Sequence, residues 1–185
     1  MAVTIQRHSI AEFDQFVLLP ENADKAFEFI GGEIVEMVSN NYASETAMII
    51  ATHIGMYLLQ NKTGRMTGAD GGYIIAGERY IPDVAYISYE KQPEPSHDAY
   101  NPNPPDLVVE VVSPTDSERQ LSIKISNYLA AGAIVWVARP DVKEVDAHTP
   151  GQAVQVLGIN GMLDGGDVLP NFKLSVREIF PEESR

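Results

Sequence analysis

Apolar residues recur along the chain at two spacings, which predict a few helices separated by short strands. Residues 44–61 are apolar at every third or fourth position, as on one face of an amphipathic helix. Residues 10–18 show a shorter helical pattern, with Ser9 as the N-cap and Pro20 just beyond the end. Residues 176–180 predict a short terminal helix. The other apolar segments are short enough to be strands.

Three pairs of these segments flank turn residues and predict β-hairpins. Gly31 and Gly32 supply the positive φ that a two-residue turn needs, and the other two turns contain Gly77 and Gly151. The predicted arms are residues 25–30 with 33–38, 73–75 with 80–88, and 143–148 with 153–159. Asp83 therefore falls within a predicted strand.

The segment after a proline-rich loop predicts a strand, a helix and a second strand. Residues 91–105 lack periodicity and predict a long surface loop. Residues 107–112 are apolar except for Glu110, which is typical of a buried central strand. A capping-box spacing opens the next helix at Thr115, and residues 134–138 return as a parallel strand. The predicted fold class is mixed α/β.

Composition narrows the class of protein. The 185 residues are 44% hydrophobic and no linker divides them, so residues 1–185 are expected to form a single domain. The chain has no Cys, which excludes disulfides and thiolate metal sites. Because it lacks a signal-peptide pattern and a run of about 18 apolar residues, we expect a cytoplasmic protein without a membrane span. The net charge of −13 weighs against strong nonspecific binding of nucleic acid.

Two acids interrupt the apolar segments. Asp83 follows Pro82, and Glu110 lies in Leu-Val-Val-Glu-Val. Burying an unpaired carboxylate costs several kcal/mol, so these two acids are expected to share a cation or a proton. Mg²⁺ takes oxygen ligands in proteins, and the backbone carbonyl of Val111 is a third oxygen beside them. The sequence therefore predicts a site for Mg²⁺, or alternatively Mn²⁺, at Asp83, Glu110 and Val111, with the two carboxylates within about 6 Å of each other.

The order of Asp83, Glu110 and a following lysine resembles the PD-(D/E)xK nuclease superfamily. Further segments resemble the Uma-type endonuclease family of bacteria: Gly-Gly-Glu-Ile-Val-Glu-Met, Thr-Gly-Ala-Asp-Gly-Gly-Tyr, Ile-Pro-Asp-Val-Ala, Val-Val-Glu-Val-Val-Ser-Pro, Ile-Lys-Ile and Tyr-Leu-Ala-Ala-Gly. The resemblance covers residues 26–180. It implies a restriction-endonuclease-like fold, with a mixed β-sheet flanked by helices.

The resemblance also implies an activity and a set of site residues. The implied activity is Mg²⁺-dependent endonuclease cleavage of phosphodiester bonds, and since relatives commonly dimerise we expect a homodimer. The resemblance does not fix the substrate, and we expect nucleic acid, with DNA favoured over RNA. Asp83 and Glu110 would hold the metal, and Lys124 would assist the attacking water. Val112 stands where the superfamily has its lysine, so Lys124 is expected to reach the acids from the following helix. Glu45 matches the place of an additional acid in some relatives.

Each of these residues also has a structural interpretation that the sequence leaves open. Asp83 suits a turn or an edge strand because it follows a proline. Glu110 suits a salt bridge with Arg119 or Lys124, and such a lysine commonly extends from a helix face into solvent. Glu45 suits stabilisation of the helix dipole. The alternative function is therefore a catalytically silent homodimeric binding or scaffold protein on the same fold.

Other polar residues have simpler interpretations. Asp106 is expected to start a strand, and Asp70 is expected to lie in a turn. The four histidines lack metal-binding spacing. Because the chain is acidic, cleavage of nucleic acid would require cations near the acid pair. The candidates are Lys124, Arg119, Arg79 and Lys91.

Overall fold

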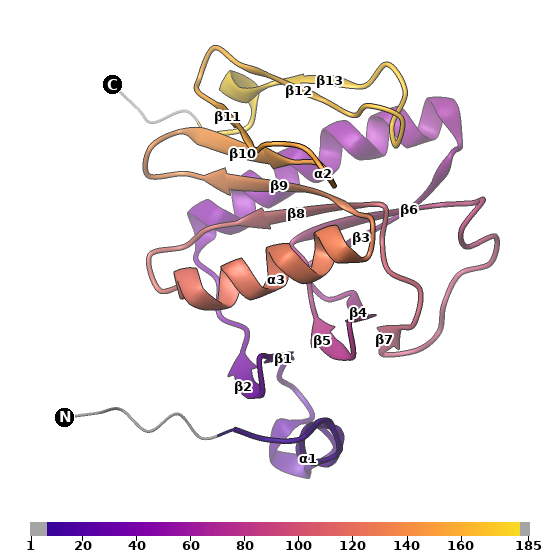
Figure 1. Ribbon diagram of the computed structural model, residues 1–185, viewed down its shortest axis with the longest axis vertical. Helices are drawn as coiled ribbons and strands as arrows, with labels where there is room; N and C mark the ends of the chain where they lie inside the picture. Colours follow the sequence, from indigo (N-terminus) through magenta and orange to yellow (C-terminus); the bar gives the residue numbers. More distant parts are fainter. Residues whose placement is uncertain (1–6, 182–185) are drawn as a thin grey trace.

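The computed structural model describes residues 7–181 and contains two large β-sheets (Figure 1). Two hairpins and one short strand form the first sheet. The strand order of this sheet is β2-β1-β5-β4-β7. Its strands are β1 (Phe27–Ile30), β2 (Glu33–Glu36), β4 (Gly72–Ile75), β5 (Glu78–Tyr80) and β7 (Tyr100–Asn101). Gly31 and Gly32 have φ values of 58° and 84°, so the predicted turn between β1 and β2 is confirmed.

The second sheet contains the predicted central strand. Its order is β11-β10-β9-β8-β6-β3. Its strands are β3 (Gly64–Gly68), β6 (Val84–Ser88), β8 (Leu107–Val111), β9 (Ile134–Arg139), β10 (Glu144–His148) and β11 (Gln155–Leu157). Strand β8 is buried along its whole length and pairs in parallel with β9 and antiparallel with β6. Both the central strand and the parallel pair are therefore confirmed.

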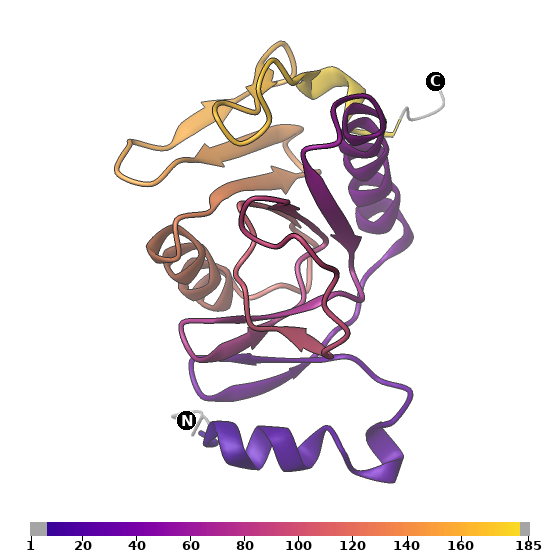
Figure 2. The same cartoon turned by 90° about the vertical axis from the view of Figure 1, so that its right-hand side faces the viewer.

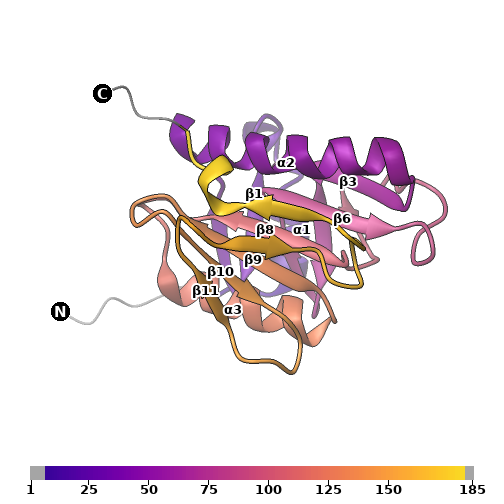
Figure 3. The ribbon, with the colours of Figure 1, turned by 90° about the horizontal axis from the view of Figure 1, so that it is seen from above.

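Two helices cover opposite faces of the second sheet (Figures 1 and 3). Helix α2 (Asn41–Asn61) packs on the face to which β8 contributes Val109, and helix α3 (Glu118–Ala130) packs on the face to which it contributes Val108. Alternate residues of a strand point to opposite faces. Glu110 therefore shares a face with Val108 and points toward α3.

Helix α3 also faces the first sheet, because its apolar cluster joins Ile30 and Tyr80 of that sheet to Val108 and Val135 of the second. Figure 2 shows α3 between the two sheets. Helix α1 (Ile10–Phe16) and the 3₁₀ turn Pro20–Asn22 lie on the other side of the first sheet. A side chain on the inner face of α3 is therefore enclosed by both sheets.

The last described segment adds a two-stranded ribbon, β12 (Met162–Asp164) and β13 (Lys173–Ser175), and the 3₁₀ turn Val176–Glu178. Phe172 stacks on Trp136 with ring centroids 6.0 Å apart. None of the helices within residues 7–181 is long and apolar enough to cross a membrane.

Some predicted boundaries are wrong. The arm predicted over residues 80–88 breaks at Ile81, and its two parts join different sheets as β5 and β6. Asp83 therefore lies in the bend before β6, since Pro82 has no N–H for a strand ladder. Helix α3 starts at Glu118 with Ser117 as its N-cap.

Thr115 does not cap α3 because residues 113–116 form a turn of their own. Ser113 donates its backbone N–H and its hydroxyl to the Asp116 carboxylate, at 2.7 and 2.9 Å. The pattern at residues 176–180 gives only the 3₁₀ turn, and strands β3, β7, β12 and β13 were not predicted. These strands are short or rich in glycine and polar residues, so they lack the alternation that identifies a strand.

Candidate active site between α3 and the two sheets

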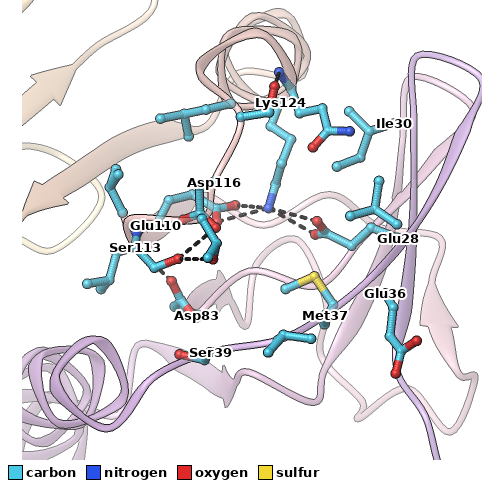
Figure 4. A pocket seen from close by; sticks show the side chains of 18 residues that line it. Glu28, Ile30, Glu36, Met37, Ser39, Asp83, Glu110, Ser113, Asp116 and Lys124 are labelled. Carbon is cyan, nitrogen blue, oxygen red and sulfur yellow. Dashed lines mark hydrogen bonds and ion pairs between the residues drawn. The ribbon is translucent and has the colours of Figure 1, made fainter. Parts of the chain in front are cut away.

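A pocket of about 440 Å³ lies where α3, the β1–β2 hairpin and the carboxyl end of β8 meet (Figure 4). The residues on its walls come from all three elements, from the segments that follow β2 and β8, and from the bend before β6. They are Glu28, Ile30, Val35, Glu36, Met37, Val38, Ser39, Asp83, Glu110, Val111, Val112, Ser113, Thr115, Asp116, Ser117, Gln120, Leu121 and Lys124. Asp83, Glu110, Val111 and Lys124, far apart in the sequence, therefore share one pocket.

Glu110 is buried on β8, with 7% of its surface exposed. One carboxylate oxygen accepts a hydrogen bond from the Tyr128 hydroxyl at 2.7 Å, and Lys124 contacts both oxygens. Burial raises the pKa of Glu110 to about 7, although Lys124 opposes this shift. Burial therefore makes the charged form of Glu110 more costly than that of an exposed glutamate.

Lys124 reaches the acids from α3, where it lies on the same face as the buried Leu121 and Tyr128. Its Nζ is 2.8 Å from Glu110 Oε1 and 2.9 Å from Glu28 Oε1. Burial alone would lower the pKa of the Lys124 ammonium, but Glu110 and Glu28 raise it above its usual range. Lys124 is therefore a fixed positive charge, and the prediction that it reaches Glu110 from the following helix is confirmed.

Glu28 is a member of this cluster that the sequence analysis missed. It lies on β1 and is 2% exposed, and its Oε1 accepts a hydrogen bond from the backbone N–H of Ile81 at 2.6 Å. A possible signal was present, since Glu28 interrupts the apolar run Phe-Glu-Phe-Ile much as Glu110 interrupts β8. The strand pattern does not show which element covers the face that bears Glu28.

Asp83 reaches the pocket from the bend before β6. Its Oδ2 accepts a hydrogen bond from the backbone N–H of Val111 at 2.6 Å, which ties it to the residue after Glu110. Burial raises the pKa of Asp83 to about 6, and the hydrogen bond from Val111 opposes this shift. Val111 thus contacts Asp83 through its N–H, and ligation by its carbonyl stays a prediction.

Other predicted residues lie elsewhere. Glu45 is exposed on α2 and does not line the pocket, so its role as an additional acid stays a prediction. Among the described residues that line the pocket, Lys124 is the one cation. The other candidate cations pair with acids outside the pocket, as Arg119 with Glu33, Arg79 with Asp14 and Lys91 with Asp106. Asp106 also accepts a hydrogen bond from the Ser88 N–H, and Asp70 lies in a turn.

The donor set suits a loosely held divalent ion. Within residues 7–181, no group of three or more histidine or acidic side chains is arranged so that it could hold a metal ion. Mg²⁺ does not need such a group, because it usually keeps several waters and takes one or two carboxylates from the protein. Asp83, Glu110 and Glu28 with the Lys124 ammonium carry two negative charges in excess when ionised. Burial raises the pKa values of Asp83 and Glu110, so a cation beside them would stabilise their charged forms.

Comparisons with known proteins identify the fold and the family. The crystal structure of a putative nuclease belonging to DUF820 from Anabaena variabilis ATCC 29413 matches with a TM-score of 0.79 and 20% identity, over 90% of this chain and 96% of the other. The protein thus has a restriction-endonuclease-like fold, a mixed β-sheet flanked by helices. No curated protein matches. The family model Uma2, described as "Putative restriction endonuclease", matches residues 13–177. Since this match spans most of the sequence, the chain belongs to the Uma2 family.

Proposed function

We propose that this protein is a Mg²⁺-dependent endonuclease that hydrolyses phosphodiester bonds of nucleic acid. The observation that supports this proposal most is the shared pocket, in which the Asp83 and Glu110 carboxylates lie with the Lys124 ammonium. The family and the structural relative support a restriction-endonuclease-like nuclease. The metal, the substrate and the residue roles are our proposal.

Asp83 and Glu110 would hold the ion, with Mn²⁺ as a substitute. A bound Mg²⁺ polarises the phosphate and lowers the pKa of an attacking water. Lys124 would donate hydrogen bonds to that water or to the phosphate and stabilise developing negative charge. It is not suited to accept a proton, because Glu110 and Glu28 raise its pKa and keep it charged. Val112 offers only an apolar side chain at the usual lysine position.

The charge of the protein explains why the substrate would need the ion. The chain carries a net charge of −13, and the pocket wall also carries Glu36 and Asp116. A polynucleotide is repelled by such a surface until a divalent ion compensates the acids. Binding of DNA, our first candidate, or RNA should therefore be weak without Mg²⁺ and stronger with it, and it should weaken as salt rises.

A catalytically silent binding or scaffold protein is the second candidate. The contacts of Lys124 with both Glu28 and Glu110 favour it, because a closed ion cluster can serve structure alone. The two functions differ in one property. A silent scaffold has no need to bind a divalent ion at Asp83.

Calorimetric titration with Mn²⁺ and a cleavage assay separate the two candidates. We expect the wild-type protein to bind Mn²⁺ and to cleave a single-stranded, duplex or branched substrate. Asp83→Asn should abolish both properties, whereas Asp70→Asn, a change in an exposed turn, should leave both intact. If none of the three substrates is cleaved and Asp83→Asn leaves the Mn²⁺ affinity unchanged, the silent scaffold protein is favoured.

The exposed face of α2 supports the predicted homodimer, which we also propose. Met48, Met56 and Leu59 are 61%, 57% and 79% exposed along one stripe of this helix. Thr52 lies in the same stripe, and its hydroxyl donates a hydrogen bond to the Met48 carbonyl. Two copies of an acidic protein repel each other least where their surfaces carry no charge.

A further inference from the structure

Glu28 joins the two halves of the pocket. Its Oε1 lies 2.6 Å from the backbone nitrogen of Ile81, two residues before Asp83, and 2.9 Å from the Nζ of Lys124. Its Oε2 lies 3.2 Å from the same Nζ. Glu28 therefore contacts both the segment that carries one acid and the lysine that pairs with the other, Glu110 (Figure 4).

The contacts of Lys124 would be redistributed if Glu110 bound a metal. Both oxygens of Glu110 now accept hydrogen bonds or ion contacts from Lys124, and one also accepts from Tyr128. A carboxylate that ligates a cation has less negative charge to share with an ammonium. Lys124 then needs a second anion that stays in place, and Glu28 is the one that the pocket provides.

We infer that Glu28 is a positioning residue, which holds Lys124 over the pocket while Glu110 is engaged and fixes the segment that leads to Asp83. This inference rests on the proposed nuclease function. Glu28 acts through Lys124 and the Ile81 N–H rather than on the substrate. A side chain held by packing and by hydrogen bonds keeps its geometry better than one held by a single partner.

The experiment compares Glu28→Gln with wild type and with Glu78→Gln. Glutamine keeps an oxygen that can accept from Ile81 but loses the charge that holds Lys124. Glu78 is the matched control, because it accepts a backbone N–H in the same sheet, from Gly31 at 2.7 Å, without contacting Lys124. We expect Glu28→Gln to weaken Mn²⁺ binding and to lower kcat, each by about 10-fold to 100-fold with KM unchanged, since partners behind the metal ligands have effects of this size. Glu78→Gln should change neither.

A second variant, Glu28→Asp, tests the inference even if Glu28→Gln does not fold. Aspartate retains the charge but is one methylene shorter, so it cannot reach Ile81 and Lys124 together. We expect Mn²⁺ affinity near the wild-type value and kcat lowered by about 10-fold. Wild-type kcat in Glu28→Asp, or Glu28→Gln effects that Glu78→Gln reproduces, would overturn the inference. If the wild-type protein itself neither binds Mn²⁺ nor cleaves, the proposed function fails instead.

Discussion

The Glu28–Lys124–Glu110 cluster and the Glu118–Arg139–Asp146 cluster have the same composition, one cation between two carboxylates, and each includes a residue of α3. Their distances are also similar, 2.8 and 2.9 Å from Lys124 to its partners, and 2.8 and 2.9 Å from Arg139 to its partners. Burial separates them. No side chain of the first cluster is more than 9% exposed, whereas Glu118 of the second is 69% exposed.

The difference shows what burial does to a group of charges. Water solvates Glu118, and its hydrogen bond from Arg139 lowers its pKa in the ordinary way. Glu110 has lost that water, and the same kind of pairing leaves its pKa raised to about 7, because burial outweighs the contribution of Lys124. The surface cluster can only join α3 to β10, while burial gives Glu110 of the other cluster an increased affinity for a proton.

Replacing the cation of each cluster should give the largest contrast. Lys124→Met leaves Glu28 and Glu110 buried without a cation, and we expect it to lower the free energy of unfolding by about 3–5 kcal/mol. Arg139→Met removes a partly solvated partner and should cost at most about 1 kcal/mol. Urea denaturation at pH 8 measures both values. Equal losses would mean that the two clusters serve the same purpose.

The pH dependence of stability should distinguish the pocket acids from surface acids. Asp83 has its pKa raised from 3.8 to about 6, and Glu110 from 4.5 to about 7. A raised pKa means that the folded protein binds the proton more tightly than the unfolded chain does. The stability from this source is fully present below about pH 4 and is lost as pH rises through 6 and 7.

Without divalent ions, we therefore expect wild type to lose about 1.4 kcal/mol between pH 5 and pH 8 relative to Asp83→Asn. Mg²⁺ should restore stability at pH 8 and have little effect at pH 5. Asp164→Asn is the control, because the pKa of exposed Asp164 is lowered and its titration is complete below this range. Thermal and urea unfolding at the two pH values measure the difference. A parallel pH course in wild type and Asp83→Asn would contradict the prediction.

An effect smaller than that of Lys124→Met is expected from the hydroxyl that Tyr128 donates to Glu110 at 2.7 Å. Tyr128→Phe leaves a buried carboxylate without one of its donors and should cost about 2 kcal/mol, since hydrogen bonds to charged groups have this value. Tyr57→Phe removes a hydroxyl that donates to the Pro170 carbonyl at the surface and should cost about 0.5–1 kcal/mol. Urea denaturation compares the pair, and similar costs would show that Glu110 is solvated.

The sequence predicted the central strand and the pocket acids Asp83 and Glu110, because an acid within an apolar segment can be recognised from its immediate neighbours. Lys124 was expected from the resemblance to the nuclease superfamily. The burial of Glu28 was not predicted, because a strand with one polar residue between two phenylalanines is also typical of a half-exposed hairpin. Only the packing of the first sheet against α3 buries that face. The break at Pro82 was missed for a related reason, since the sheet that each part joins depends on long-range pairing.

The exposed stripe of α2 should give the smallest effect on folding. Leu59→Glu places a charge on an outward-facing side chain that is 79% exposed, so the free energy of unfolding of the monomer should change by less than about 0.5 kcal/mol. If two copies pair through this stripe, light scattering at micromolar concentration should give a mass near twice 20.3 kDa for wild type and near 20.3 kDa for Leu59→Glu. Met162→Glu, an exposed apolar residue on β12, should leave the mass unchanged. A monomeric wild type would refute the pairing. That result would not bear on the buried cluster, because Leu59 does not line the pocket.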